Sequence, residues 1–319
     1  MIALKKQLQH ELKRFNVQEK QIETLFIGGG TPSTVDSKLY EPIFKILKPL
    51  LKENAEVTSE ANPNSATEAW LQGMYDLGVN RISFGVQSFN EQKLKALNRA
   101  HSPQQAITAV QIAHEIGFKN LSLDLIYNYE GDTKALLAHD ISEAFKLPIN
   151  HISAYELTIE SGTKFASTPQ VRQVDDALAF FVAEEITKRG FTHYEISNFG
   201  TYQSEHNKGY WHLKPYMGVG AGAVGFKTDV RYYPRTDIEL YIKEPLIIDE
   251  EKLTQEELLT EKLFLGLRSN LGVDEDILSE AMKKRADFLV EKEKLLKENT
   301  TYKNNNYFIA DELVLYILD

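Results

Sequence analysis

Three consecutive glycines, Gly28 to Gly30, stand directly after a short apolar run and are followed by Thr31 and Pro32. Because glycine has no Cβ, such a loop can turn sharply and bring backbone N–H and C=O groups close to a ligand. The spacing matches neither a phosphate-binding P-loop nor the G-x-G-x-x-G turn of dinucleotide-binding proteins. A tight turn between a strand and a helix is the alternative, and the position at a strand end favours the ligand.

A second group of polar residues ends or interrupts other apolar runs. Glu60 and Gln87 each end one, and Asp124 lies inside the run Leu121 to Ile126. A buried carboxylate is costly unless it is paired, so we expect Asp124 to have a fixed partner or a ligand. Arg99 is able to clamp a carboxylate through its guanidinium group. For each residue taken singly, a structural hydrogen bond, a helix cap or, for Arg99, a solvated surface position is the alternative.

A third segment combines histidines, flat aromatic rings and nearby glycines. His206, Tyr210, Trp211 and His212 are followed by a glycine-rich stretch at 218–225. This mixture suits a large planar ligand, and haem iron accepts histidine as an axial ligand. A packed cap with hydrogen-bonded histidines is the alternative. No Ser-His-Asp order, HExxH zinc motif or EF-hand loop occurs.

The elements that position these residues follow from an alternation of apolar, often β-branched runs with helical periodicity. Repeated βα units favour a parallel sheet with right-handed crossovers. Because polar residues gather at the C-terminal ends of the runs, we expect an α/β fold built as an open, partial (β/α)6 TIM-like barrel with its function at that face. Strands are expected at Thr24–Ile27, Glu56–Ser59, Arg81–Val86, Leu121–Ile126, His151–Leu157 and Tyr194–Ser197. Helices are expected at Leu39–Leu51, Glu68–Leu77, Gln104–Ile116, Lys134–Phe145 and Asp175–Arg189.

The same patterns divide the chain into three parts. Residues 1–200 are assigned to the barrel, residues 201–250 to an aromatic and glycine-rich connection, and residues 251–319 to a small helical, winged-helix-like module. Residues 1–15 predict an amphipathic helix that begins without a capping residue, which suggests that a preceding segment is missing. In the last part we expect helices at Thr254–Leu267, Asp274–Met282 and Phe288–Lys297, a β-hairpin that ends at Tyr307–Ala310, and a final helix at Glu312–Leu318.

Composition restricts the partners and the chemistry. With 36 Lys+Arg against 46 Asp+Glu, the formal net charge is −10, and a negative field repels phosphate backbones, so we expect no nucleic-acid partner. No apolar run reaches the roughly 18 residues of a membrane span and no signal peptide is visible, so we expect a cytoplasmic protein, with a peripheral membrane contact left open. The chain has no cysteine, which excludes disulfides, cysteine nucleophiles, zinc-thiolate sites and a cysteine-ligated iron–sulfur cluster within it.

Long ordered runs are spread over nearly the whole chain. They are LFIGGGTPS, TSEANPN, GVNRISFGVQSFNEQKLKALNR, GFKNLSLDLIY, ISAYELTIESGTKF, HYEISNFG, HNKGYW, GVGAGAVGF and LFLGLRSNLGVD. These runs resemble radical S-adenosylmethionine (radical SAM) proteins related to oxygen-independent coproporphyrinogen oxidase, and more closely the HemW group of haem chaperones. The length of the chain favours the HemW group over the oxidase.

The resemblance implies that the barrel holds S-adenosylmethionine across the C-terminal ends of its strands. No catalytic or metal-ligating residue of this chain is assigned. The implied cofactor-binding residues are Gly29, Gly30 and Thr31 for the methionine moiety, with Glu60, Gln87, Arg99 and Asp124 completing the clamp on the nucleotide and amino acid.

The chain departs from the family at its start. The first barrel strand and the CxxxCxxC loop, which ligates a [4Fe–4S] cluster in the family, would lie before Met1. Without thiolates we expect this chain alone to assemble no cluster and to be catalytically inactive. A truncated sequence and a degenerate relative are the two explanations, and the uncapped first helix favours truncation. The resemblance also predicts histidine in many relatives where this chain has Val224, so we assign no haem ligand there.

Three functions remain open from the sequence. The first is a HemW-like chaperone that binds haem, delivers it to apo-proteins and, in a full-length form, also binds S-adenosylmethionine and a [4Fe–4S] cluster. The second is an oxygen-independent coproporphyrinogen III oxidase, which decarboxylates propionate side chains in porphyrin biosynthesis. The third is a cluster-free scaffold that binds a protein partner. For the first, we expect the haem ligand at His206 or His212, with His193 as a competing candidate.

Overall fold

The computed structural model describes residues 1–159 and 169–319, so the end of the run ISAYELTIESGTKF lies outside the described residues. Within these ranges the chain folds into two compact units, and each candidate site lies in one of them. Unit 1 consists of Met1–Glu23, Tyr40–Ala55 and Glu205–Asp319, and unit 2 of Thr24–Leu39 and Glu56–Ser204.

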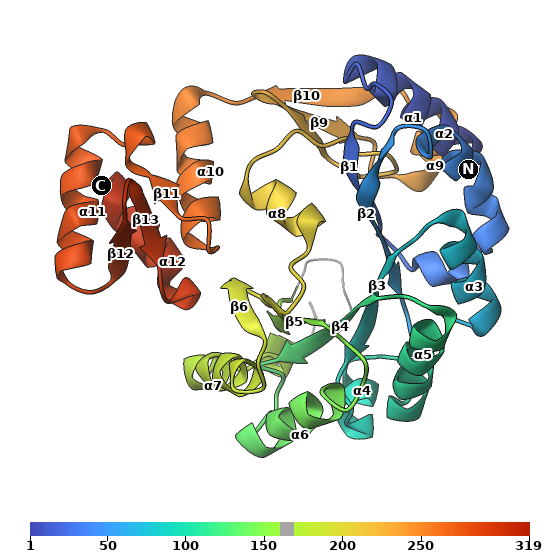
Figure 1. The fold of residues 1–319 in the computed structure, drawn as a ribbon, viewed down its shortest axis with the longest axis horizontal. Coiled ribbons are helices and arrows are strands. Elements are labelled where there is room, and N and C mark those ends of the chain that lie inside the picture. The colour runs from blue at the N-terminus through green and yellow to red at the C-terminus, as the bar shows by residue number, and fades with distance from the viewer. Residues whose placement is uncertain (160–168) are drawn as a thin grey trace. The chain divides into compact units, whose positions relative to one another are not determined.

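The main sheet has seven strands in the order β1-β2-β3-β4-β5-β7-β6. Strands β2 to β5 pair in parallel, each with the next strand along the chain, and helices α3 (Glu68–Leu77), α5 (Pro103–Ile116), α6 (Lys134–Ala144) and α7 (Asp176–Thr187) cover one face of the curled sheet (Figure 1). This arrangement confirms the predicted partial barrel. The strands are β1 (Ile22–Ile27), β2 (Leu51–Ala61), β3 (Arg81–Gln87), β4 (Asn120–Tyr127), β5 (His151–Glu156), β6 (Thr192–Glu195) and β7 (Asn198–Gly200).

The end of the sheet differs from the prediction. Instead of one parallel strand at Tyr194–Ser197, the chain forms a hairpin in which β7 pairs antiparallel with both β5 and β6. The turn consists of Ile196 and Ser197, and an apolar residue in a turn hides it from a periodicity argument. The single parallel strand predicted at Tyr194–Ser197 is therefore wrong, because Tyr194 and Glu195 end β6 whereas Ile196 and Ser197 form the turn.

The helices of unit 2 begin and end as local chemistry dictates. Thr67, Ser102, Thr133 and Asp175 each accept a hydrogen bond from a backbone N–H in the first turn of a helix, which satisfies one of its unpaired donors. The helices are α3 (Glu68–Leu77), α4 (Glu91–Ala96), α5 (Pro103–Ile116), α6 (Lys134–Ala144) and α7 (Asp176–Thr187).

The helix predicted at Leu39–Leu51 is shorter than expected. A 3-10 turn at Ser37–Tyr40 precedes α2 (Glu41–Leu47), and Leu51 already belongs to β2. The helix ends just before Pro49, because proline has no backbone N–H to continue the helical hydrogen bonds; Lys48 itself still has helical dihedral angles.

In unit 1, α1 (Ile2–Arg14) is held by one buried amide. The Gln7 side chain donates to Gly218 O at 3.2 Å and accepts from Gly220 N at 2.8 Å and from Tyr241 Oη at 2.7 Å. Tyr241 lies on α9 (Ile238–Lys243). The glycine-rich stretch is thus pinned to the first helix. A three-stranded antiparallel sheet of β8 (Gly225–Lys227), β9 (Val230–Pro234) and β10 (Ile248–Lys252) follows.

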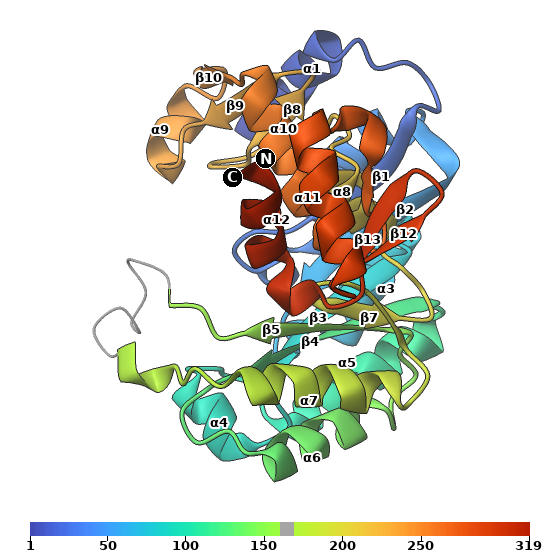
Figure 2. The same cartoon turned by 90° about the vertical axis from the view of Figure 1, so that its left-hand side faces the viewer.

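The C-terminal part of unit 1 has the helices and small sheet of the predicted winged-helix-like module. Its core includes Leu263, Leu289 and Leu313, one from each helix, and Figure 2 shows α11 and α12 beside the hairpin. The elements are α10 (Gln255–Leu267), β11 (Val273–Asp274), α11 (Glu280–Glu291), β12 (Leu295–Glu298), β13 (Thr301–Asn304) and α12 (Ala310–Leu318).

Three boundaries in this module were predicted wrongly. Asp274–Met282 is a 3-10 turn followed by the start of α11, and Phe288–Lys297 divides between the end of α11 and β12. The hairpin is β12 and β13, whereas Tyr307–Ile309 is a 3-10 turn. Glu293 and Asn299 adopt positive φ, and these turns are not marked by glycine or proline, so the helical pattern seemed to continue.

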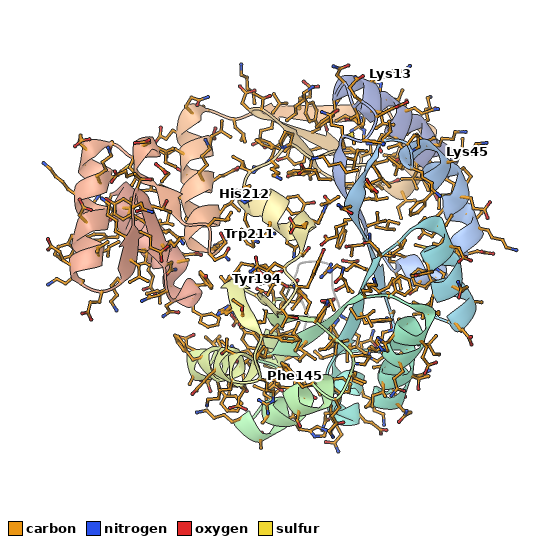
Figure 3. All side chains as sticks on the ribbon, viewed as in Figure 1. Lys13, Lys45, Phe145, Tyr194, Trp211 and His212 are labelled. Atoms are coloured by element: carbon orange, nitrogen blue, oxygen red, sulfur yellow. The ribbon has the colours of Figure 1, made fainter. Side chains whose placement is uncertain are left out.

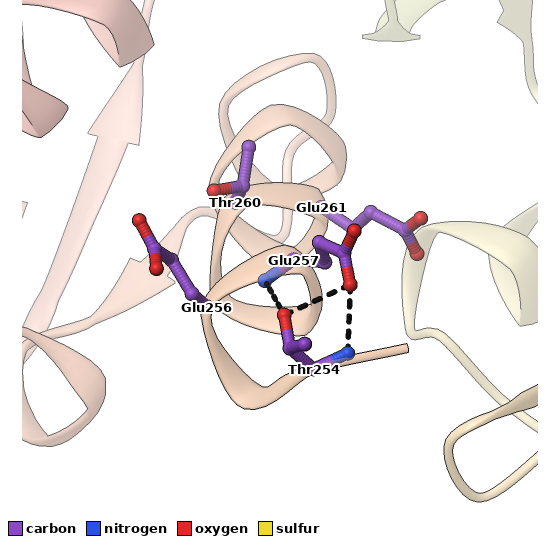
Figure 4. A pocket seen from close by; sticks show the side chains of 5 residues that line it. All are labelled: Thr254, Glu256, Glu257, Thr260 and Glu261. Atoms are coloured by element: carbon purple, nitrogen blue, oxygen red, sulfur yellow. Dashed lines mark hydrogen bonds between the residues drawn. The ribbon is translucent and has the colours of Figure 1, made fainter. Parts of the chain in front are cut away.

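The start of α10 shows a reciprocal cap. Thr254 Oγ1 accepts from the Glu257 N–H at 3.2 Å, while Glu257 Oε2 accepts from the Thr254 N–H at 2.7 Å (Figure 4). This capping box fixes the residue at which α10 begins. In the part of the chain that the structure describes, no helix is long and apolar enough to cross a membrane.

Candidate functional site

The glycine loop after β1 lies against the end of β2. Gly29 and Gly30 adopt φ of 78° and 60°, a left-handed conformation that side chains with a Cβ rarely accept. A Cβ on Gly28 would lie 2.5 Å from the Phe26 ring. The Gly29 N–H donates to Glu60 Oε2 at 3.3 Å. The glycines therefore allow the loop backbone to approach Glu60 and a ligand bound beside Glu60.

Thr31 continues this loop. Its carbonyl accepts hydrogen bonds from the Thr34 N–H at 3.0 Å and the Thr34 hydroxyl at 2.7 Å, so Thr31 opens the 3-10 turn Pro32–Thr34. Its own side chain makes no capping hydrogen bond. The structure places Thr31 next to Gly30 in sequence but records no direct interaction of its side chain with the other predicted site residues.

Asp124, on β4, is the most strongly perturbed carboxyl group of the predicted site. Burial, followed by the negative charge of Glu60, raises the pKa of Asp124 to about 6, although hydrogen bonds from Ser153 and Ser83 oppose the change. The Ser83 hydroxyl donates to Asp124 Oδ1 at 3.2 Å. Burial also raises the pKa of Glu60. Two carboxyl groups that repel each other favour a cation or a hydrogen-bond donor between them.

Arg99 brings the opposite charge to this region. It follows α4, and burial lowers its pKa while the charge of Asp124 opposes the change. The Arg99 guanidinium thus lies within electrostatic range of the Asp124 carboxyl group. Such a set suits a ligand that carries both an ammonium and a carboxylate group, because each ligand charge finds an opposite partner.

Gln87 ends β3 in a strained backbone conformation. Its φ is 68°, and the register between β3 and β4 shifts between Phe84 and Gln87. Non-glycine residues at positive φ cost free energy and gather at ligand sites. His101 stabilises the same strand end, since its Nε2 lies 2.9 Å from Val86 O. Gln87 ends β3, which lies between β2, the strand of Glu60, and β4, the strand of Asp124.

A buried lysine that sequence reasoning missed supports this face. The side chain of Lys93, on α4, is 1% exposed, and its Nζ lies 2.7 Å from Asp132, 3.9 Å from Asp140 and 2.7 Å from Ile126 O. Asp140 also accepts from the Ser88 hydroxyl and the Phe89 N–H, both at 2.7 Å. This network ties the chain just after Gln87 to the end of the strand that carries Asp124.

A polar row extends from Asp124 across the rest of the sheet. Cross-strand register places Asp124 beside Ser153, Ser153 beside Asn198, and Asn198 beside Glu195. Burial raises the pKa of Glu195 to about 7. Within the described residues, Glu195 Oε1 and Asn198 Oδ1 are buried without a hydrogen-bond partner. Sequence reasoning missed Glu195, because only the register of the hairpin places it beside Asn198.

The second candidate region is α8 (Glu205–Trp211) in unit 1. His206 Nε2 lies 3.1 Å from Tyr210 Oη, one helical turn away, and the two rings meet edge to face at 4.9 Å. Tyr210 packs in turn against Tyr216, with ring centroids 4.7 Å apart. The i, i+4 spacing of His206 and Tyr210 produces the pair directly from the helix geometry.

The end of α8 carries two further polar rings. Figure 3 labels both, Trp211 and His212. Trp211 Nε1 is buried with no hydrogen-bond acceptor among the described residues. His212 is exposed, and partial burial together with Lys214 and Lys208 lowers its pKa. The lowered pKa favours the neutral imidazole, the form that ligates iron.

His193, the competing candidate, is a packing residue in unit 2. Its ring stacks on Phe199 with centroids 4.1 Å apart, and burial lowers its pKa to about 4. His193 thus belongs to a different unit from His206 and His212, which are residues of unit 1.

A cavity of about 390 Å³ lies beside Tyr210 within unit 1. Tyr210, Tyr216 and Phe264 contribute aromatic walls, and Arg231 and Arg268 contribute charge. Apolar walls with a few placed polar groups are typical of small-molecule sites. The sequence pointed to Tyr210 but not to the arginines, which lie far from it along the chain.

The donor set for an iron–sulfur cluster is missing. The chain has no cysteine, and among the described residues no three histidine or carboxylate side chains gather as metal ligands. A [4Fe–4S] cluster is held by thiolates, so the residues of this chain do not fit that group.

Comparison with known proteins places the chain in a family. The radical SAM superfamily matches residues 4–143. The protein "Heme chaperone HemW" of Lactococcus lactis is 32% identical over 277 residues, which cover 82% of this chain and 73% of that protein. The protein of the same name from Bacillus subtilis is 34% identical over 291 residues, with coverage of 85% and 76%.

Among solved structures, coproporphyrinogen III oxidase (HemN) from Escherichia coli, a radical SAM enzyme, superposes with a TM-score of 0.80 and covers 99% of this chain and 81% of its own. At 18% identity this likeness concerns the fold, and it confirms the curled half-barrel. Together with the sequence identities to the chaperones, it shows that the chain belongs to the HemW family within the radical SAM superfamily.

Proposed function

We propose that this chain binds haem on α8 and passes it to apo-proteins; its relatives carry the name heme chaperone. The observation that carries the proposal is the His206–Tyr210 pair at 3.1 Å, which stands at the edge of the aromatic cavity. A porphyrin requires a flat apolar slot and an axial donor. The cavity walls offer the slot, and α8 offers the donor.

In this proposal one residue of the His206–Tyr210 pair ligates the haem iron and the other accepts a proton. A phenol whose proton is accepted by a neighbouring imidazole is a better donor to iron, because negative charge builds on its oxygen. In this assignment Tyr210 ligates the iron and His206 accepts the proton. His212, exposed on the same segment, is the alternative donor. Haem is cargo in this function, and its iron is held by residues of unit 1 alone.

Spectroscopic titration tests this assignment. Haem is added to the parent chain and to His206→Ala, Tyr210→Phe and His212→Ala, and the Soret band is followed. We expect His206→Ala and Tyr210→Phe to weaken binding by about tenfold or more, since the first removes the proton acceptor and the second removes the oxygen that ligates the iron. His139→Ala, an exposed imidazole on α6, is the matched control. Parent-like binding by all three variants of the segment would remove α8 from the site.

We also propose that the strand ends of unit 2 bind S-adenosylmethionine. The ammonium group of the ligand would contact Asp124 and Glu60, and its carboxylate would contact Arg99. The methionine moiety would lie against the backbone of the loop at Gly29 and Gly30. Because this chain has no thiolates, the cluster iron that anchors this ligand in radical SAM enzymes finds no ligands here, and we expect binding to be weak. When bound, S-adenosylmethionine would supply a sulfonium group, and no reaction step of this chain is assigned to it.

Calorimetry separates these roles. Asp124→Ala and Arg99→Gln should each weaken S-adenosylmethionine binding by about tenfold, since each leaves one ligand charge without its partner. Asp76→Asn, on the exposed face of α3, should bind like the parent. Unchanged affinity in Asp124→Ala would take Asp124 out of the site.

A further inference from the structure

Arg268 is placed to recognise a carboxylate inside the cavity next to Tyr210. It directly follows the last turn of α10, and its guanidinium lies over the Phe264 ring at 5.2 Å from the centroid. Both residues line the cavity. Stacking on an aromatic face holds the planar guanidinium in one orientation and leaves its N–H edge available to an acceptor.

At present that edge is filled by a side chain of the protein itself. Arg268 Nε donates to Asp311 Oδ1 at 2.7 Å and Arg268 Nη2 donates to Asp311 Oδ2 at 2.6 Å. The two parallel bonds are the geometry with which arginine binds any carboxylate. A ligand carboxylate could take the place of Asp311 without any change in the arginine.

The exposure of the pair favours such an exchange. The Asp311 side chain is 56% exposed and that of Arg268 is 34% exposed, and solvent-exposed ion pairs contribute little to stability. Asp311 also stands in the first turn of α12, where the helix dipole stabilises its charge without a cation partner. Releasing the Asp311 side chain into solvent therefore costs little free energy.

The other cavity arginine is held more firmly. Arg231 binds Glu261, which belongs to the same cavity wall, and the two side chains are only 27% and 23% exposed. Tyr216 is a further hydrogen-bond partner of Arg231. Arg231 thus has its acceptors inside the wall, whereas Arg268 has its acceptor on the solvent side.

We propose that Arg268 binds one propionate of the haem, with Asp311 as a resident carboxylate that the ligand displaces. The proposal rests on the haem binding proposed above and adds the group that recognises the ligand's carboxylate. It assigns the free porphyrin acid, rather than a neutral porphyrin, as the preferred cargo. The iron-binding contact on α8 and the carboxylate contact on Arg268 then hold opposite edges of one ligand.

A purely structural role for the pair makes a different prediction. If the pair served only to join α10 to α12, removing either partner would have the same effect on haem binding. If Asp311 competes with the ligand, the two removals act in opposite directions: Arg268→Gln weakens binding and Asp311→Asn strengthens it. The sign of the Asp311→Asn effect therefore separates the two roles.

The experiment titrates iron protoporphyrin IX and its dimethyl ester, in which both carboxylates are blocked, into the full chain and follows the Soret band. We expect the parent to bind the acid about tenfold more tightly than the ester, since a charge-assisted bidentate contact is lost in the ester. Arg268→Gln should abolish that preference, and Asp311→Asn should tighten binding of the acid several-fold with little effect on the ester.

The control is Arg189→Gln, which removes an arginine that is paired with Glu185 at 2.8 Å on the surface of unit 2. It should keep the parent's preference, and thermal unfolding of each variant shows that it is folded. Equal binding of acid and ester by the parent, or weaker binding by Asp311→Asn, overturns the assignment of Arg268. A Soret band that stays at its free-haem position when haem is titrated into the parent instead overturns the proposed haem function.

Discussion

At the scale of single residues, the buried Asp124 carboxyl group lowers the stability of the fold when it is ionised. Its pKa rises from 3.8 to about 6, first by burial and then by the charge of Glu60. A carboxyl group whose pKa is higher in the folded state stabilises the fold below its unfolded pKa, and this contribution is lost as the pH rises through the folded pKa. Above pH 6 the folded protein therefore carries an unfavourable charge that a ligand cation would relieve.

We predict that Asp124→Asn is more stable than the parent at pH 7.5. The pKa shift corresponds to about 3 kcal/mol at most, at roughly 1.4 kcal/mol for each pH unit. The advantage should shrink as the pH falls through 6 and disappear near pH 4, where the parent carboxyl is protonated as well. Urea unfolding at several pH values measures it, with Asp76→Asn as control. A difference that is the same at pH 4 and pH 7.5 would contradict the assigned pKa.

Single residues also show what a sequence reveals about a site. Asp124 could be singled out because an acidic residue interrupts an apolar strand, and Glu60 and Gln87 because they end strands. Lys93 could not, since its sequence neighbours are those of an ordinary surface helix and only the fold supplies its buried partners. Glu195 was missed for a related reason, because a register shift of the hairpin turns its carboxyl toward the polar row.

At the scale of elements, Lys93 joins three of them. It lies on α4, its partner Asp140 lies on α6, and its third contact is the carbonyl of Ile126 on β4. These contacts fix the loops that follow Gln87 and Asp124. Removing the cation from such a network leaves two buried carboxylates without a partner, which is strongly destabilising.

We predict that Lys93→Met unfolds with a free energy about 3–5 kcal/mol below the parent, because Asp132 and Asp140 are left buried without a cation. Chemical denaturation gives this number. Lys95→Met, an exposed position on the same helix, keeps the helix propensity comparable and should change the free energy of unfolding by less than about 0.5 kcal/mol. If both variants lose the same amount, the buried network does not hold these loops.

Elements that carry their own start and stop signals could be predicted from the sequence. The helix α3 lies at the predicted residues, between the cap at Thr67 and the left-handed Gly78. Elements whose boundaries depend on tertiary pairing could not. The division of the last strand into β6 and β7, and the position of the C-terminal hairpin, follow from turns without glycine or proline, where positive φ at Asn299 is supported by the pairing of β12 with β13.

At the scale of the whole molecule, the two candidate sites differ in composition as well as in place. The site in unit 2 is built from carboxylates, one arginine and a glycine loop, whereas that in unit 1 is built from aromatic rings and arginines. The net charge of −10 makes arginines in a cavity more selective, because anions are otherwise repelled by the surface. The described residues of each proposed site belong to one unit, so we expect each ligand to protect the unit that binds it.

Hydrogen exchange measured by mass spectrometry tests that division. We predict that haem slows exchange in peptides covering residues 205–216 and 261–268, and that S-adenosylmethionine slows exchange in peptides covering residues 28–31, 85–90 and 122–128. A ligand that binds only the folded state lowers the rate of local opening around its contacts, by a factor that grows with its concentration over Kd. Tyr210→Phe should remove the haem effect and leave the S-adenosylmethionine effect, and Asp124→Ala should do the reverse. Protection of the strand ends of unit 2 by haem alone would show that the two ligands have been assigned to the wrong units.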